Sequence, residues 1–189
     1  MIAGKVIFIV ALIMQIIIRY PYRKRVDYSK SDRQERFLLL LITIGGVVIP
    51  FIYIFSGWLA FADYRLPGWL VGVGAVIMAG GLWLFWRAHT DLGHNWSSTL
   101  EIQAQHTLVT TGVYRRIRHP MYSAMWLMIL AQPFLLTNWL AGFCGLVTFG
   151  AMYFLRVPKE EALMLQTFGD PYRQYMAQTG RIFPTGGFR

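Results

Sequence analysis

The stretch from Met121 to Leu155, MYSAMWLMILAQPFLLTNWLAGFCGLVTFGAMYFL, decides the fold because it is apolar and too long for one membrane crossing. A helix needs about 20 apolar residues to cross the hydrocarbon core of a bilayer, and somewhat shorter helices are tolerated. The polar residues Thr137 and Asn138 interrupt the stretch near its middle. We therefore predict a helical hairpin with arms over Pro120–Leu136 and Trp139–Leu155.

Three further apolar runs precede this hairpin, at Ile2–Ile18, Phe37–Phe61 and Pro67–Trp86. Each is long enough to be read as a membrane crossing. No small-residue cleavage site follows the first run, so we expect it to be a retained span rather than a removed signal peptide. The predicted fold class is an all-α integral membrane protein with about five transmembrane helices.

Glycine and proline interrupt two of the runs. The second run contains Gly45-Gly46 and Pro50, so we expect a kink there. The third contains Gly68-x-x-x-Gly72 and Gly80-Gly81, and small residues at such positions let a neighbouring helix approach closely.

Composition agrees with a membrane protein. Hydrophobic residues make up 56% of the 189 residues and charged residues only 14%. The net charge of +9 would suit a nucleic-acid partner on a soluble surface, but the basic residues cluster between apolar runs, so we expect membrane lipids and no nucleic acid as partners. The single cysteine, Cys144, excludes a disulfide within the chain and is interpreted as core packing.

The basic residues predict the orientation. With five spans, all but two of the 18 Lys and Arg residues fall on one side, and only Lys5 and Arg65 fall on the other. Positive residues mark the cytoplasmic side. We therefore expect the N-terminus outside and the C-terminus in the cytoplasm, in the plasma membrane of a prokaryote or the endoplasmic reticulum of a eukaryote.

The hairpin brings two polar segments to the same cytoplasmic face, a loop over residues 87–119 and a tail over residues 156–189. His119 and Glu160 are therefore predicted to be neighbours in space. In the tail, Pro158 is expected to open one helix, which Gly169 would cap, and Asp170-Pro171 to open a second. Tyr172, Tyr175 and Met176 would form the buried side of the second helix, as a lid over the membrane face.

Soluble-type catalytic motifs are absent from the sequence, which contains no Walker A loop, no HExxH and no Ser-His-Asp signature. His89, His94 and His106 are irregularly spaced, so we predict no metal site.

Two groups of motifs resemble a known family. Residues 106–114, HTLVTTGVY, and residues 118–122, RHPMY, are similar to the cofactor-binding segment of isoprenylcysteine carboxyl methyltransferases. The tail motif at residues 156–163, RVPKEEAL, followed by Phe168-Gly169, Tyr172 and Tyr175, resembles the C-terminal signature of the same family. The resemblance covers roughly residues 100–185, and Ala124 stands where the family commonly has glycine. The short chain resembles the compact prokaryotic branch.

The resemblance implies methyl transfer from S-adenosylmethionine to the carboxylate of a prenylated cysteine or a similar isoprenoid acid. The expected partner is therefore a lipid-modified peptide or an isoprenoid substrate. Residues 1–86 would then form three N-terminal transmembrane helices, and residues 87–189 the catalytic region around the hairpin at 120–155. Arg156 and Glu160 would be catalytic, with Arg156 holding the substrate carboxylate. The cofactor contacts implied are His106, Thr107, Leu108, Val109, Tyr114, His119, Pro120, Met121, Tyr122 and Glu160.

Three other functions remain open at this stage. A phospholipid amine N-methyltransferase has related C-terminal features but needs a general base and favours acidic residues over an arginine at its substrate site. A sterol-type reductase has a similar tail but uses NADPH. A non-catalytic membrane scaffold would tolerate replacement of Arg156 and Glu160. The sequence indicates no particular oligomeric state.

Overall fold

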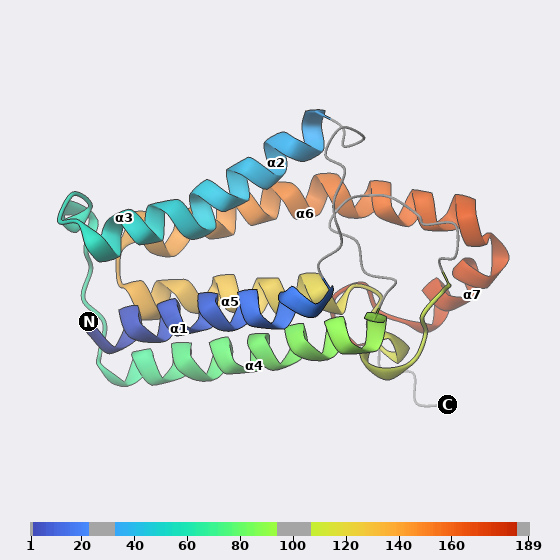
Figure 1. Cartoon of the computed structure of the whole chain (residues 1–189), viewed down its shortest axis with the longest axis horizontal. Helices are drawn as coiled ribbons and strands as arrows, with labels where there is room; N and C mark the ends of the chain where they lie inside the picture. Colours follow the sequence, from blue (N-terminus) through green and yellow to red (C-terminus); the bar gives the residue numbers. More distant parts are fainter. Residues whose placement is uncertain (1, 23–32, 94–106, 185–189) are drawn as a thin grey trace.

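The computed structural model describes residues 2–22, 33–93 and 107–184, which are almost entirely helical. Figure 1 shows α1, α4, α5, α6 and a continuous rod formed by α2, η2 and α3 lying side by side, with the short α7 beyond one end of the bundle. The elements are α1 (Ile2–Arg19), η1 (Tyr20–Tyr22), α2 (Arg33–Thr43), η2 (Ile44–Val48), α3 (Ile49–Phe55), η3 (Ala60–Ala62), α4 (Trp69–Leu92), η5 (Gly112–Arg115), α5 (Pro120–Leu136), α6 (Trp139–Phe168) and α7 (Asp170–Gln178).

The helices confirm the all-α membrane fold class. Among the described residues, four segments are long and apolar enough to cross a bilayer, namely Ile2–Tyr22, Arg33–Phe55, Trp69–Leu92 and Trp139–Phe168. The apolar helix α5 has only 17 residues. At 1.5 Å per residue it is about 25 Å long, somewhat less than the hydrocarbon core. The fifth crossing therefore stays a prediction.

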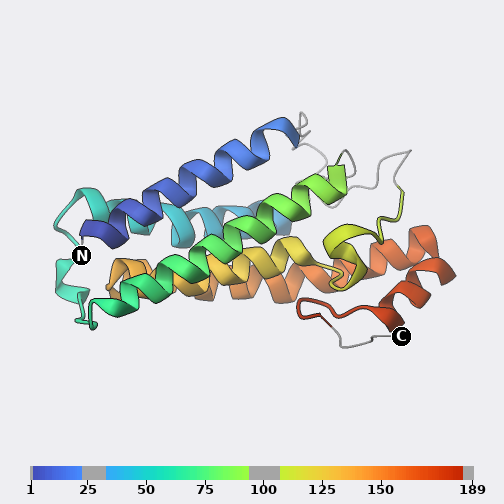
Figure 2. The same cartoon turned by 90° about the horizontal axis from the view of Figure 1, so that it is seen from below.

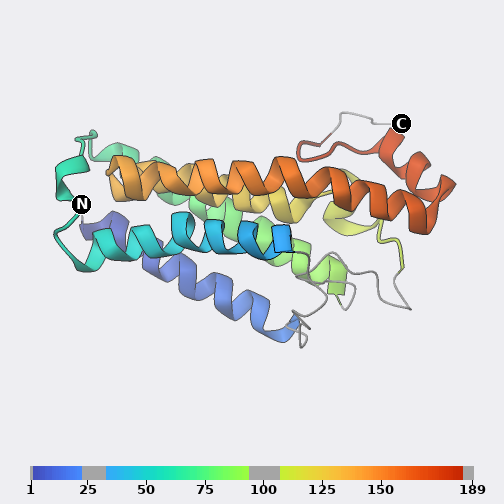
Figure 3. The same cartoon turned by 90° about the horizontal axis from the view of Figure 1, so that it is seen from above.

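The bundle has two layers that share α5 (Figures 1 and 2). On one side, α5 packs with α1 and α4 around a core that includes Phe8, Phe85 and Leu135. On the other side, α6 and α2 pack around Phe149 and Leu38, as seen from above in Figure 3. Because α5 is covered from both sides, its fixed position determines where its first residues meet the end of α6.

The second apolar run departs from its expected limits. The helix begins at Arg33 rather than Phe37 and ends at Phe55 rather than Phe61. The disruption predicted at Gly45-Gly46 takes the form of a π-helical turn, η2. A Cβ atom at Gly45 would meet Thr148 Oγ1 of α6 at 2.5 Å, so this turn lets α6 approach the backbone directly.

Only part of the glycine prediction holds for α4. A Cβ atom at Gly81 would lie 2.6 Å from Met128 Cγ of α5, so Gly81 permits the close contact between these helices. No heavy atom of the described chain lies within 4 Å of a Cβ built at Gly68, Gly72 or Gly80, and the expectation that these three assist packing is wrong. All three are exposed, on faces that no helix of the described residues covers.

The turn between α5 and α6 is built by the two polar residues that interrupt the apolar stretch. Thr137 adopts a left-handed conformation with φ of 47°, and Asn138 caps α6 by accepting hydrogen bonds from the amides of Leu140 and Ala141 at 3.1 and 3.0 Å. The Asn138 amide group donates in turn to Asp63 Oδ1 at 2.8 Å.

The tail differs from its predicted form because α6 does not end at Leu155. The helix continues through Pro158 to Phe168, so the prediction that Pro158 opens a separate helix is wrong. A proline inside a helix removes one backbone hydrogen bond, but the chain on both sides of Pro158 is held by side-chain contacts with neighbouring elements. The proposed division at residue 86 stays untested, and α4 itself continues past it to Leu92.

Candidate active site

The segment before α5, the last turns of α6 and α7 meet at one end of the bundle (Figure 1). Polar side chains of these elements contact one another there. The segment before α5 is held by α4. Asp91 accepts a hydrogen bond from the Val113 amide at 2.9 Å, and the buried Tyr114 donates to the Ala88 carbonyl at 3.3 Å. This anchoring aligns residues 107–119 along the end of the bundle.

Helix α7 covers the same segment. As predicted, α7 begins at Asp170-Pro171 after Gly169, whose φ of 56° turns the chain, and Tyr172 and Tyr175 are buried. The Tyr175 hydroxyl donates to the Tyr114 carbonyl at 2.7 Å. Burial raises the pKa of Tyr175 to about 12, and burial followed by the charge of Glu160 also raises the pKa of Tyr114. Both phenols therefore act as neutral donors.

The chain after α7 is bound to the start of α5 by backbone hydrogen bonds. The amides of Arg118 and His119 donate to the carbonyls of Gly180 and Arg181 at 2.8 and 2.9 Å, and Ser123 Oγ donates to the Ile182 carbonyl at 2.7 Å. These contacts bring Arg181, which is distant in sequence, beside the RHPMY motif.

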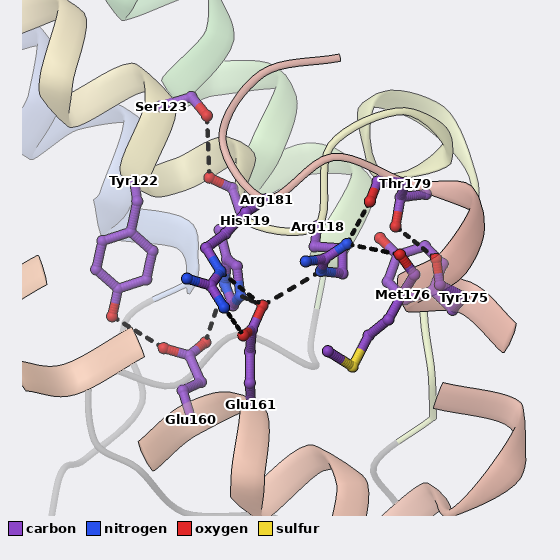
Figure 4. A network of polar contacts seen from close by, with 10 residues as sticks. All are labelled: Arg118, His119, Tyr122, Ser123, Glu160, Glu161, Tyr175, Met176, Thr179 and Arg181. Atoms are coloured by element: carbon purple, nitrogen blue, oxygen red, sulfur yellow. Dashed lines mark hydrogen bonds and ion pairs between the residues drawn. The ribbon is translucent and has the colours of Figure 1, made fainter. Parts of the chain in front are cut away.

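Glu161 is the centre of a buried ionic cluster, shown in Figure 4. Its carboxylate accepts from Arg181 Nη2 at 2.6 Å, Arg118 Nε at 3.2 Å and His119 Nε2 at 3.3 Å. The Glu161 side chain is only 6% exposed. The hydrogen bond to Glu161 raises the pKa of Arg181. These partners come from the segment before α5 and from the tail after α7, so Glu161 joins both to α6.

The adjacent Glu160 has a different environment. Its Oε2 accepts a hydrogen bond from the Tyr122 hydroxyl at 2.9 Å, and its Oε1 lies 3.8 Å from His119 Nδ1, beyond hydrogen-bonding distance. The side chain is 32% exposed. Within the described part of the chain Oε1 accepts no hydrogen bond, so one oxygen of Glu160 can accept donors from a bound molecule.

Arg156 lies one helical turn before Glu160 on α6, so both side chains project from the same face of the helix. Its Nη1 forms an ion pair with Glu35 Oε1 of α2 at 3.1 Å, and its side chain is 11% exposed. Tyr122, in the first turn of α5, donates a hydrogen bond to Glu160 on this face. The three side chains thus belong to one polar region.

The structure brings together some of the predicted site residues. His119, Tyr122 and Glu160 are in contact, as expected from the hairpin, and Pro120 and Met121 lie beside them at the start of α5. Tyr114 contributes through its backbone, because its carbonyl accepts the hydrogen bond from Tyr175 of α7. The other predicted contacts lie further up the chain: Thr107 is exposed, Leu108 and Val109 are half-buried in the segment before η5, and His106 lies outside the described residues.

Sequence reasoning missed Glu161, Arg181 and Glu35, and it quoted Arg118 without giving it a role. Helical spacing supplied a signal for Glu161, because it follows the buried Val157 by four positions and therefore shares its inward face. No local pattern marks Arg181 or Glu35, which reach the site only through tertiary packing. Among the described residues, no group of three His, Cys, Asp or Glu side chains is placed to hold a metal ion.

Comparison with known proteins identifies the family of this chain. The model of the isoprenylcysteine carboxyl methyltransferase family matches residues 72–166, about half of the chain. A probable protein-S-isoprenylcysteine O-methyltransferase of Oryza sativa subsp. indica is 31% identical over 110 residues, covering 57% of this chain and 58% of that protein. The protein-S-isoprenylcysteine O-methyltransferase of Homo sapiens is 27% identical over 140 residues, covering 69% of this chain and 48% of that protein. The chain thus spans about half the length of these relatives.

A solved structure shares the fold. The eukaryotic intramembrane Ras methyltransferase, solved without a monobody, superposes with a TM-score of 0.57 over 90% of this chain and 60% of that protein, at 22% sequence identity.

The fold and the site define a multi-pass, all-helical membrane protein with a buried ionic cluster and a partly open carboxylate at one end of the bundle. More particularly, the family match shows that the chain belongs to the isoprenylcysteine carboxyl methyltransferase family.

Proposed function

We propose that this protein transfers a methyl group from S-adenosylmethionine to the carboxylate of a prenylated cysteine or a similar isoprenoid acid. The observation that carries the proposal is that Arg156 and the partly exposed Glu160 lie one helical turn apart on the same face of α6, in a chain of this family. Arginine suits a carboxylate because its planar fork matches both oxygens.

The residues present fit S-adenosylmethionine. The open Oε1 of Glu160 can accept hydrogen bonds from ribose hydroxyls or from an ammonium group, and Tyr122 fixes the other oxygen. His119 through Tyr122 lie alongside, with Tyr114 behind them. When bound, the cofactor would supply a sulfonium-activated methyl group: a C–O bond forms to the acceptor carboxylate as the C–S bond breaks, leaving a neutral thioether.

The chain itself needs to align the reactants and keep water out. A carboxylate is already nucleophilic at neutral pH, so no general base is required, and the barrier is lowered by orientation and desolvation. Arg156 orients the acceptor carboxylate, Glu160 orients the donor, and the docked tail with Tyr172 and Tyr175 covers the site. A lipid-borne acceptor would enter from the bilayer, whereas the soluble donor would come from the water phase.

We also propose that this end of the bundle faces the cytoplasm, with the N-terminus outside and, for a prokaryotic source, the plasma membrane as location. The distribution of Lys and Arg supports this orientation, since Lys5 and Arg65 are the only two among the described residues that belong to the opposite end.

The test is methyl transfer by purified protein in detergent, using methyl-labelled S-adenosylmethionine and a farnesylated cysteine analogue. Base-labile volatile methanol reports a methyl ester specifically. Arg156→Ala is expected to lower kcat/KM by on the order of 30- to 4,000-fold, because losing one partner of a buried charge pair costs about 2–5 kcal/mol. Glu160→Gln is expected to weaken S-adenosylhomocysteine binding roughly tenfold or more.

Lys159→Ala is the matched control, since Lys159 lies between the two residues on α6 and its exposed amine contacts Gln34 of α2. Cofactor binding without methanol release would contradict the carboxylate acceptor. Absence of cofactor binding would contradict the methyltransferase itself and favour the reductase or scaffold.

A further inference from the structure

Glu35 lies in the first turn of α2, outside residues 72–166 that the family model matches. Its side chain is 8% exposed, and its carboxylate forms the ion pair with Arg156 at 3.1 Å. A residue from the N-terminal helices therefore contacts the arginine that is proposed to hold the acceptor. Because removing two charges from water is costly, a buried ion pair beside a candidate site suggests a functional role.

The position of Glu35 is set mainly by the apolar packing of α2 on α6. One turn further along α2, Leu38 is buried against Phe149 and Met152 of α6. One residue before Glu35, Gln34 accepts a hydrogen bond from Lys159 Nζ at 2.6 Å, but this contact is exposed and contributes little. The buried packing thus fixes the backbone from which Glu35 meets Arg156.

The burial of Arg156 explains why a carboxylate is useful there. The Arg156 side chain is only 11% exposed. Without Glu35, its full charge would act on an acceptor carboxylate in a poorly hydrated region, where charge interactions are strong. A carboxylate held that tightly in the ground state is a poorer nucleophile, because only interactions that strengthen in the transition state accelerate the reaction.

We propose that Glu35 is a positioning residue for methyl transfer, which holds the Arg156 guanidinium and offsets its charge so that the acceptor carboxylate is oriented without losing its reactivity. This proposal rests on the proposed function. A guanidinium has five N–H donors, so an arginine can contact more than one carboxylate, and the ion pair with Glu35 is made through Nη1.

The test compares Glu35→Gln with Glu35→Asp and the neighbouring control Gln34→Ala. Glu35→Gln keeps a hydrogen-bond acceptor but removes the charge. It is expected to lower kcat about tenfold, consistent with losing a charged hydrogen bond, while KM for the farnesylated cysteine analogue stays equal or falls. The Kd for S-adenosylhomocysteine should be unchanged. Glu35→Asp retains the charge and should recover most of kcat, and Gln34→Ala should match wild type.

A second arm separates positioning from folding. Arg156→Gln removes the partner charge, so the double variant Glu35→Gln/Arg156→Gln leaves no uncompensated charge from this pair. In that background, Glu35→Gln is expected to change kcat/KM less than about twofold, because residues that act through one contact are not additive. A large residual effect would mean that Glu35 acts on folding, and would overturn the proposal.

Two other outcomes are informative. A normal wild-type rate with an unaffected Glu35→Gln variant would overturn the role of Glu35 and leave the proposed function standing. The wild-type protein could instead bind S-adenosylhomocysteine but bind the farnesylated cysteine analogue no more tightly than its methyl ester. That result would overturn both proposals.

Discussion

Two adjacent glutamates show how much depends on the environment of a single residue. Glu161 is buried and bonded to Arg118, His119 and Arg181, whereas Glu160 keeps one oxygen open and is partly exposed. Successive residues of a helix point about 100° apart, so a one-position difference separates a carboxylate that holds the fold from one that can bind a ligand.

We predict that Glu161→Gln destabilises the protein and that Glu160→Gln does not. Breaking a buried ionic cluster by removing one partner typically costs about 3–5 kcal/mol, because it leaves the opposite charges uncompensated. Thermal unfolding in detergent, followed by fluorescence, measures the difference between these isosteric variants. Equal melting temperatures for the two would show that the cluster around Glu161 does not hold the tail in place.

At the scale of elements, α4 and α5 approach each other closely at two glycines of α4, Gly74 and Gly81. Gly81 faces Met128 and the Ala124 carbonyl, whereas its neighbour Gly80 faces no described atom within 4 Å. The motif predicted both to assist packing, but a helix presents only one of two consecutive residues to a given partner.

We predict that Gly81→Ala is destabilising and that Gly80→Ala is neutral or slightly stabilising. Overpacking at Gly81 should cost about 1–3 kcal/mol, whereas alanine at Gly80 gains up to about 1 kcal/mol of helix propensity. The melting temperatures of the two variants in the same detergent provide the measurement. A Gly81→Ala protein as stable as wild type would show that α4 and α5 tolerate a wider separation.

The whole molecule has a marked charge asymmetry between its two ends. The acidic and basic side chains of the site come from the segment before α5, the later part of α6 and the tail, while Asp63 and Asn138 interact at the turn between α5 and α6, at the other end of both helices. The distribution of Lys and Arg then predicts which end meets the cytoplasm.

Two exposed alanines at opposite ends allow this orientation to be measured. In a Cys144→Ala background, Ala60→Cys should react with a membrane-impermeant maleimide in intact cells, and Ala177→Cys should react only after the membrane is opened. The opposite labelling pattern would reverse the proposed orientation and place the candidate site outside the cytoplasm.

The sequence alone was enough for the class of fold and for part of the site. Long apolar runs separated by basic residues admit few structures in a bilayer, because backbone groups in hydrocarbon must be satisfied within helices. The polar pair Thr137-Asn138 located the turn before α6, and the turn in the chain then implied that His119 and Glu160 would be neighbours.

Only the tertiary structure decided which residues complete the site. Glu35 and Arg181 lie far from Arg156 and Glu161 in sequence and reach them because α2 packs on α6 and because the tail pairs with the start of α5. The continuation of α6 through Pro158 was likewise set by contacts along the helix rather than by the local preference of proline. Local patterns determine helices and their ends, whereas partners across helices depend on packing between distant segments, and no single stretch of sequence records that packing.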